Sequence, residues 1–150
     1  MIEVQAVIGR IQLRRMSDWH AARFCNARMI WHVAERLVGL RVPQPGEDVA
    51  HAAYKCYLFV EPQRLSTNWS RDRIIQEIVA AGVPCYAGSC SEIYLEKAFE
   101  GTGWQPHERL AVARELGETS LMFLVHPTLL AKEIEQTCSV LQAVMARAVH

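Results

Sequence analysis

The sequence has no excess of charge of either sign, because 16 Lys and Arg residues balance 16 Asp and Glu residues. Nucleic-acid binders need surplus positive charge to attract the phosphate backbone, so we expect no DNA or RNA partner. Long apolar runs are also missing. No run exceeds the one at residues 121–125, which is far too short to cross a bilayer, and polar residues interrupt the apolar start. We therefore expect neither a membrane span nor a signal peptide.

Paired cysteines are lacking as well. The five cysteines are odd in number and share no repeated spacing, a pattern typical of free thiols in a reducing cytoplasm. Cys85 and Cys90 have no second Cys or His pair at ligand spacing, so we expect no metal site. Lysine is scarce too, with only Lys55, Lys97 and Lys132. Each of the three is interpreted as a solvated surface residue, as most lysines are.

The 150 residues, 51% of them hydrophobic, are enough for one buried core, and we expect a single domain over residues 1–150. Apolar residues at helical spacing predict two helices or one kinked helix within residues 2–38, followed by a sheet-and-helix body over residues 39–150. In that body, residues 53–60, 83–87 and 121–125 are predicted strands. The last of them is apolar throughout, which is typical of a strand covered on both faces.

Three more helices are predicted between and after these strands. Ser70 is a candidate cap for a helix that buries Ile74, Ile75, Ile78 and Val79 and ends at Gly82. A short helix over residues 107–116 is expected to end at Gly117, and a long one covers residues 130–148. The fold class is therefore α/β of the α+β type, with a small sheet of about three strands and helices mainly on one face. The intervening stretch 88–106 is irregular, and such stretches are usually functional or disordered.

His126 and Cys90 are the residues whose types suggest chemistry. His126 follows an apolar strand and could face a ligand, but no acid partner is evident, so a structural role competes with a catalytic one. Cys90 lies among polar groups that could ionise a thiol, yet neither a glycine turn nor a base accompanies it. The pattern thus predicts no catalytic residue.

Residues 1–13, 85–99 and 111–128 resemble, in order and spacing, the C-terminal domain of the DegT/DnrJ/StrS family of sugar aminotransferases, which depend on pyridoxal phosphate (PLP). The resemblance implies that the catalytic lysine lies upstream of the matching segments, so this chain alone would hold no cofactor. It also implies an asparagine motif just before the first helix, where Met1 stands at the motif's methionine. A natural truncation, a late translation start or a deliberately made fragment would each explain that position.

The resemblance further implies that residues 82–94 line a nucleotide-sugar pocket. Ser89 and Ser91 replace an aromatic residue and a proline that are common in relatives, while other polar groups remain. The candidate substrate-binding residues are Tyr86, Ser89, Glu92, Tyr94 and His126. A loop tied down by its own polar groups is the competing interpretation.

The expected function is therefore that of a small domain from an enzyme that moves an amino group from glutamate to a keto-sugar nucleotide, inactive alone and weak at best in binding nucleotide sugars. The alternative is a non-catalytic interaction module, or the partner of a separately encoded PLP-binding half. Val4, Ile8 and Ile11 form an apolar stripe that predicts a homodimer through the first helix.

Overall fold

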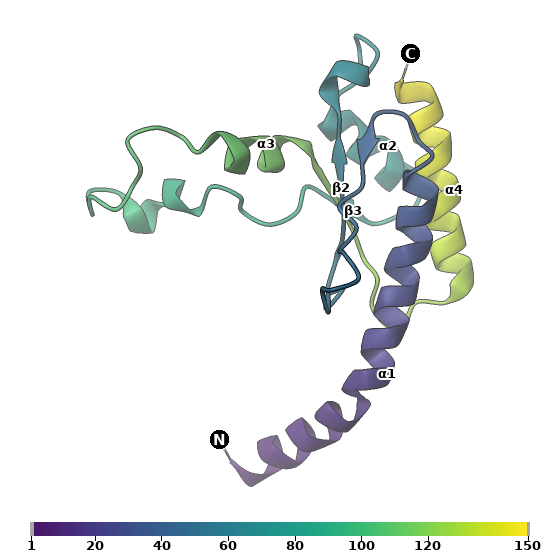
Figure 1. Cartoon of the computed structure of the whole chain (residues 1–150), viewed down its shortest axis with the longest axis vertical. Coiled ribbons are helices and arrows are strands. Elements are labelled where there is room, and N and C mark those ends of the chain that lie inside the picture. The colour runs from purple at the N-terminus through teal and green to yellow at the C-terminus, as the bar shows by residue number, and fades with distance from the viewer. Residues whose placement is uncertain (1, 150) are drawn as a thin grey trace.

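The structure is a computed structural model that describes residues 2–149 (Figure 1). Its helices within this range are α1 (Glu3–Ala34), α2 (Arg71–Ala80), α3 (Ala111–Thr119) and α4 (Ala131–Ala148). Its strands are β1 (Leu40–Arg41), β2 (Cys56–Val60), β3 (Cys85–Tyr86) and β4 (Ser120–Phe123). Short 3-10 turns occur at η1 (Pro62–Arg64), η2 (Ile93–Leu95) and η3 (Lys97–Phe99). The predicted α+β class is confirmed.

The four strands form one antiparallel sheet in the order β1-β2-β4-β3. Tyr57 pairs with Met122, and Tyr86 pairs with the other side of the same residue. Side chains alternate along β2, so that Cys56 is buried while Tyr57 is only half-buried. The sheet therefore has one covered face and one partly open face. About three strands were expected, and the fourth is the two-residue β1, which is too short to leave a periodic signal.

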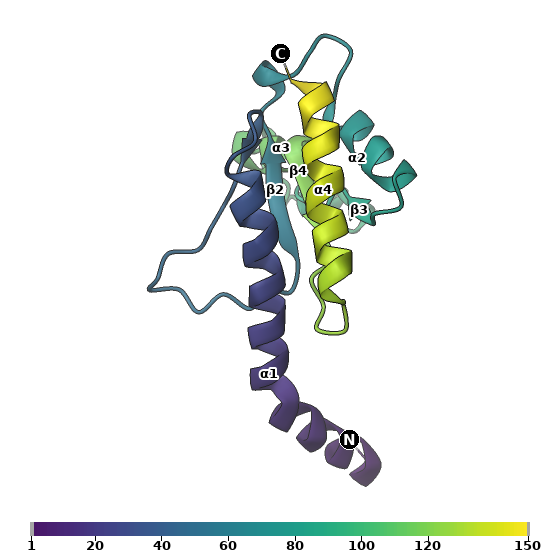
Figure 2. The same cartoon turned by 90° about the vertical axis from the view of Figure 1, so that its right-hand side faces the viewer.

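Helices α1 and α4 lie side by side over the covered face, and α2 packs beside α4 (Figure 2). Their inward residues meet the inward residues of β2 and β4 in one core. Trp31 and Leu141 are among its fully buried members, together with Leu58 and Phe123. Removing such side chains from water is the main stabilising contribution to a fold of this size. The expected arrangement, with helices mainly on one face, is confirmed.

Residues 3–34 form one continuous helix that bends, which resolves the two alternatives for the start of the chain (Figures 1 and 2). Its last third is anchored, since Ala27, Ile30, Trp31 and Ala34 are buried. Its first half projects away from the rest of the structure (Figure 2). The apolar stripe of that half is exposed, with Ile8 at 52%.

Some local predictions were wrong. Helix α3 runs over Ala111–Thr119, so Gly117 lies inside the helix rather than at its end. In α2, Ile74 and Ile78 are buried and Ile75 is half-buried against the core, as expected, whereas Val79 is 50% exposed. By contrast, Ser70 does cap α2, its hydroxyl accepting the Arg73 N–H at 3.2 Å.

The strand predictions were correct in existence but too long at their ends. The apolar run 121–125 was expected to be covered on both faces, yet Met122 and Leu124 are only half-buried. Helices cover one face alone, and an irregular segment leaves from the other side (Figure 1). Two of the predicted site residues, Tyr86 and Ser89, lie on that partly open face.

Candidate functional site

Residues 87–119 leave the sheet after β3 and return into β4 as a projecting arm (Figure 1). At the root of the arm, Arg71 on α2 donates to the carbonyl oxygens of Gly117 at 3.0 Å and Ser120 at 3.2 Å. The Ser120 hydroxyl donates to the Ala87 carbonyl oxygen. These bonds fix both ends of the arm where they leave the sheet.

Two predicted site residues, Glu92 and Tyr94, hold the two halves of the arm together. The Arg109 guanidinium donates to both carboxylate oxygens of Glu92, at 2.9 Å from Nε to Oε1. The Tyr94 hydroxyl donates to the same Oε1 at 2.6 Å and accepts the Leu110 N–H at 2.9 Å. The interpretation of a loop tied down by its own polar groups therefore describes these two residues well.

The electrostatics agree with that geometry. The hydrogen bonds from Arg109 and then from Tyr94 lower the pKa of Glu92 to about 2. Burial and the hydrogen bond to Glu92 raise the pKa of Tyr94. Glu92 is thus an anion at neutral pH, and its carboxylate already accepts three hydrogen bonds. As a general acid or base it is poorly suited.

The other loop residue, Ser89, lies against the open face of the sheet. Its hydroxyl is 3.3 Å from the Tyr57 hydroxyl on β2. Tyr57, Gly88, Ser89, Met122 and residues 49–55 line a hollow of about 570 Å³, called here the sheet-face groove. Tyr86 lies beside it on β3, paired with Met122 and 48% exposed. Tyr86 and Ser89 therefore share one face of the sheet.

Gly88 makes this arrangement possible. Its φ is +91°, and a Cβ at this position would lie 2.8 Å from Cε1 of Tyr57. Only glycine both adopts such a backbone angle readily and lets the chain pass this close to an aromatic ring. The loop therefore packs directly on the Tyr57 ring, and this brings the Ser89 hydroxyl close to the Tyr57 hydroxyl.

Three residues on the rim of the groove were missed by sequence reasoning. The Lys55 ammonium lies 5.4 Å from the centroid of the Tyr54 ring, and the Arg23 guanidinium from α1 lies 5.6 Å from the same centroid. Lys55, which had been interpreted as a solvated surface lysine, is half-buried and lines the groove. Tyr54 is 70% exposed. No local spacing could have linked Arg23 to residues 54 and 55, because helix α1 and the loop meet only in three dimensions.

His126 is not part of this assembly. It follows the end of β4, whereas Tyr86 pairs with Met122 within the strand and the chain then runs toward the start of β4, where the Ser120 hydroxyl meets the Ala87 carbonyl. Its Nδ1 is 2.7 Å from the Thr128 hydroxyl, and its carbonyl oxygen accepts from Asn26 on α1 at 3.4 Å. These contacts favour the structural role over the catalytic one.

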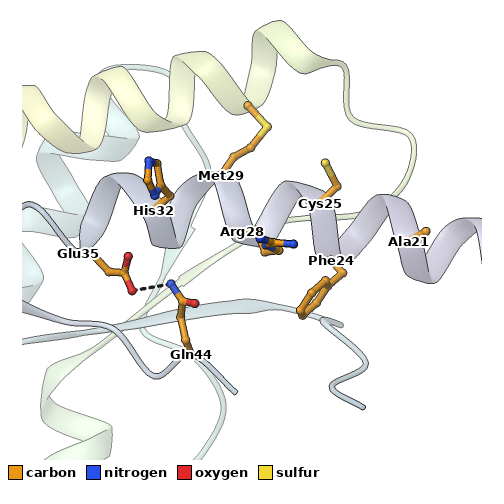
Figure 3. Close-up of a pocket in the computed structure, with 8 residues that line it drawn as sticks. All are labelled: Ala21, Phe24, Cys25, Arg28, Met29, His32, Glu35 and Gln44. Atoms are coloured by element: carbon orange, nitrogen blue, oxygen red, sulfur yellow. Dashed lines mark hydrogen bonds between the residues drawn. The ribbon is translucent and has the colours of Figure 1, made fainter. Parts of the chain in front are cut away.

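Another hollow lies along one flank of α1, with a volume of about 640 Å³ (Figure 3). Cys25 and Met29 point to the α4 side of the helix, and Phe24 points to the opposite side (Figure 3). The carboxylate in its lining, Glu35, already accepts from the Gln44 amide at 2.6 Å. Among residues 2–149, no imidazole or carboxylate is hydrogen-bonded to Cys25.

Comparison with known proteins places the chain in a family. A model of the DegT/DnrJ/EryC1/StrS aminotransferase family matches residues 1–142. The chain belongs to this aminotransferase family. The predicted resemblance is thereby confirmed at the level of the family. No curated protein matches the chain.

Solved structures of aminotransferases share the fold. An aminotransferase from Psychrobacter cryohalolentis is 52% identical with a TM-score of 0.90, and the match covers 97% of this chain and 39% of that one. TlmJ from Streptoalloteichus hindustanus is 21% identical with a TM-score of 0.78, covering 93% and 35%. The sugar aminotransferase CalS13 from Micromonospora echinospora is 11% identical with a TM-score of 0.70, covering 87% and 32%. This family member therefore spans between 32% and 39% of the length of these relatives.

The PLP chemistry that the family implies needs a lysine amine, a partner for the ring nitrogen and a cradle for the phosphate. Lys97 and Lys132 are exposed on η3 and α4. Lys55 faces a groove that no carboxylate lines and that no helix N-terminus enters. Among residues 2–149, Lys55 thus lies apart from the two other groups that this chemistry needs.

Residues 2–149 show neither a metal cluster nor a membrane-spanning helix. Within them, no three His, Cys, Asp or Glu residues gather closely enough to hold a metal ion. None of the helices described here has the length and apolar content needed to cross a membrane. All five cysteines are free thiols, as their number and spacing predicted.

Proposed function

We propose that this chain is the small-domain part of a PLP-dependent sugar aminotransferase and that it forms the substrate side of a pocket completed by a cofactor-binding part. One observation carries the proposal. Nearly the whole chain matches, at 52% identity and a TM-score of 0.90, a portion that makes up only 39% of another aminotransferase. At such identity and likeness of shape, a corresponding place in the enzyme is the simplest explanation. Free thiols are typical of proteins in a reducing cytoplasm, and we propose this location for the chain.

The composition of the groove supports a substrate role rather than a cofactor role. Ser89 and Tyr57 offer two hydroxyl groups on an open sheet face, with Tyr86 beside them. Binding sites commonly combine apolar walls with a few polar groups of this kind. Glu92 and Tyr94 then act as positioning residues that shape the arm, whereas His126 is left out of the site.

The exposed apolar surface of the chain supports an interaction with a partner. The free half of α1 leaves Val4, Ile8 and Ile11 between 43% and 64% exposed, and on the arm Trp104 is 77% exposed. Such surfaces on a soluble chain mark interaction sites. We propose that α1 pairs with a second copy of the chain, and that the arm contacts the cofactor-binding part. A non-catalytic interaction module remains the second candidate, favoured by the same exposed stripe.

The test is reconstitution of activity. The chain is mixed with PLP alone, and then with PLP and a separately produced cofactor-binding part from the 52% identical aminotransferase. We expect amino transfer from glutamate to a nucleotide-linked keto sugar only in the complete mixture. A matched control replaces the chain with a variant that carries Glu92→Gln and Arg109→Gln, which should loosen the arm and reduce the activity.

Two results would contradict the proposal. One is a PLP absorbance band formed by the chain alone and lost when Lys55, Lys97 or Lys132 is replaced. The other is stable assembly with the cofactor-binding part but no activity above that of this part alone. The second result would favour the interaction module instead.

A further inference from the structure

The arm has no hydrophobic core of its own. From Tyr86 to Glu118 every residue is exposed or half-buried, and burial returns only at Thr119 and Ser120, where the chain re-enters the sheet. Segments with few buried apolar contacts open locally at low cost in free energy. The direction in which the arm leaves the sheet therefore depends on its polar contacts.

Contacts inside the arm join its two halves into one unit. The returning half bonds to the outgoing half through Arg109 at Glu92 and through the Leu110 N–H at the Tyr94 hydroxyl. Nearer the tip, the Gln105 side-chain amide donates to the Tyr94 carbonyl oxygen at 2.8 Å. These bonds fix the shape of the arm. Because none of them reaches the sheet, they leave the direction of the arm open.

Arg71 supplies a contact between the arm and the body of the structure. It is the first residue of α2, and its side chain is only 17% exposed. Its Nη1 donates to the carbonyl oxygens of both Gly117 and Ser120, while its Nε donates to Asp72 at 2.7 Å. Gly117 lies in the last turn of α3, where carbonyl groups lack partners within the helix and a cation is favourable. Arg71 therefore ties the returning half of the arm to α2.

The outgoing half of the arm meets the returning half at the same place. A Cβ on Gly117 would overlap the Ser91 hydroxyl and would lie 3.2 Å from the Ser91 Cβ. The glycine inside α3 thus lets the outgoing chain pack directly on this helix. The Ser120 hydroxyl also donates to the Ala87 carbonyl oxygen. Both halves are consequently held at the segment 117–120, to which Arg71 is bonded.

We propose that Arg71 is a positioning residue that sets the direction of the arm relative to the sheet. It holds segment 117–120, and this segment in turn holds Ser91 by packing and Ala87 by a hydrogen bond, on either side of Ser89. A guanidinium suits this role because it stays charged and presents its donors in a rigid plane. The direction of the arm is argued from these contacts, and only its consequence for substrate binding rests on the proposed function.

The experiment compares the arm with the sheet by nuclear magnetic resonance of the full chain. In the native chain, residual dipolar couplings of α3 and of β2 and β4 should fit one common orientation. Arg71→Met keeps the apolar stem but removes the donors. We expect α3 to lose the common orientation and its amides to exchange with solvent about tenfold faster or more, while β2 and β4 are unchanged. Arg71→Lys should restore both properties, because an ammonium also carries several donors on one nitrogen.

A matched control lies on the same helix. Arg73 bonds to the Asn68 carbonyl oxygen instead of the arm, so Arg73→Met should leave α3 unchanged. A second pair of variants keeps Arg71 intact. Alanine is normally favoured over glycine inside a helix, yet Gly117→Ala should speed the exchange of α3 amides because its Cβ overlaps the Ser91 hydroxyl. In a Ser91→Gly background the overlap is gone, and Gly117→Ala should slow this exchange.

Four results would overturn the proposal. They are unchanged couplings and exchange in Arg71→Met, an equal loss of protection in β2 and β4, an equal effect of Arg73→Met, and slower α3 exchange when Gly117→Ala is made in the native background. None of these measurements requires PLP or activity. In the reconstituted mixture, Arg71→Met should raise the KM for the keto sugar more than it changes kcat. An unchanged KM beside altered couplings would contradict the proposed function but not the role of Arg71 in the arm.

Discussion

Replacing Gly88 by alanine should test how closely the loop packs on the sheet face. The change carries two costs. An alanine held at a φ of +91° costs about 1–2 kcal/mol. Its Cβ would also lie 2.8 Å from Cε1 of Tyr57, and overpacking of this kind costs about 1–3 kcal/mol. We expect Gly88→Ala to lower the free energy of unfolding by about 2–5 kcal/mol.

A matched glycine separates the two costs. Gly101, in the arm, has a φ of +72° with no heavy atom within 4 Å of a built Cβ. Gly101→Ala should therefore lose only about 1–2 kcal/mol, the backbone contribution. The remaining difference belongs to the contacts of the added Cβ, chiefly with Tyr57 and to a lesser extent with the Ser120 hydroxyl at 3.3 Å. Urea unfolding followed by far-UV circular dichroism measures both, and each kcal/mol corresponds to about 2–4 °C in Tm for a chain of this length.

A double-variant cycle checks the cause. In a Tyr57→Ala background the ring is gone and only the weaker contact with the Ser120 hydroxyl at 3.3 Å is left, so Gly88→Ala should cost less than in the native background, with a coupling of about 1 kcal/mol or more. Gly88→Ala in the native background should also separate the Ser89 and Tyr57 hydroxyls, because the ring or the loop must move. If Gly88→Ala proves no more costly than Gly101→Ala, the close packing of the loop on Tyr57 is wrong.

Three other changes have defined outcomes. Arg109→Gln should raise the pKa of Glu92 from about 2 toward its ordinary value, measured by carboxyl titration, and an unchanged pKa would contradict the role of Arg109. Since the folded-state pKa of Glu92 is depressed, its contribution to stability is present above the ordinary carboxyl pKa and is lost as the pH falls toward 2. Ile8→Asp should abolish self-association in sedimentation while Gln12→Asp on the same helix preserves it, and a monomeric native chain at high concentration would refute the α1 dimer. A water-soluble thiol reagent should label two exposed cysteines quickly and spare three buried ones under native conditions, the former being Cys25 and Cys90 and the latter Cys56, Cys85 and Cys138.

Features encoded by neighbouring residues could be predicted. Helix α2 has its cap at Ser70, its buried pair at Ile74 and Ile78, and a glycine with a φ of +83° at position 82, all within thirteen positions of the chain. Helix α4 has the predicted apolar face at regular spacing. Local propensity and periodicity determine such elements, and they survive tertiary packing when both agree.

Features encoded by distant residues could not be predicted. Glu92 and Arg109 are 17 positions apart, and Tyr57 and Ser89 are 32 apart, so no spacing rule connects them. The site prediction therefore treated Glu92 and Ser89 as equivalent loop residues. The structure separates them, because a bidentate guanidinium engages one carboxylate fully, whereas the Ser89 hydroxyl stays on the surface of a groove.

The incorrect expectation for β4 is informative in the same way. An apolar run predicts that a strand is covered but leaves the covering element unidentified. Here helices cover one face, while Met122 and Leu124 remain half-buried beside the exposed Tyr86. Apolar side chains on an open face are stabilised when another surface covers them. The open face also carries the sheet-face groove, so a covering part would enclose this groove and strengthen its polar interactions by excluding water. A cofactor-binding part placed there would thus cover the second face of β4, as the sequence pattern predicts. It would also complete the pocket.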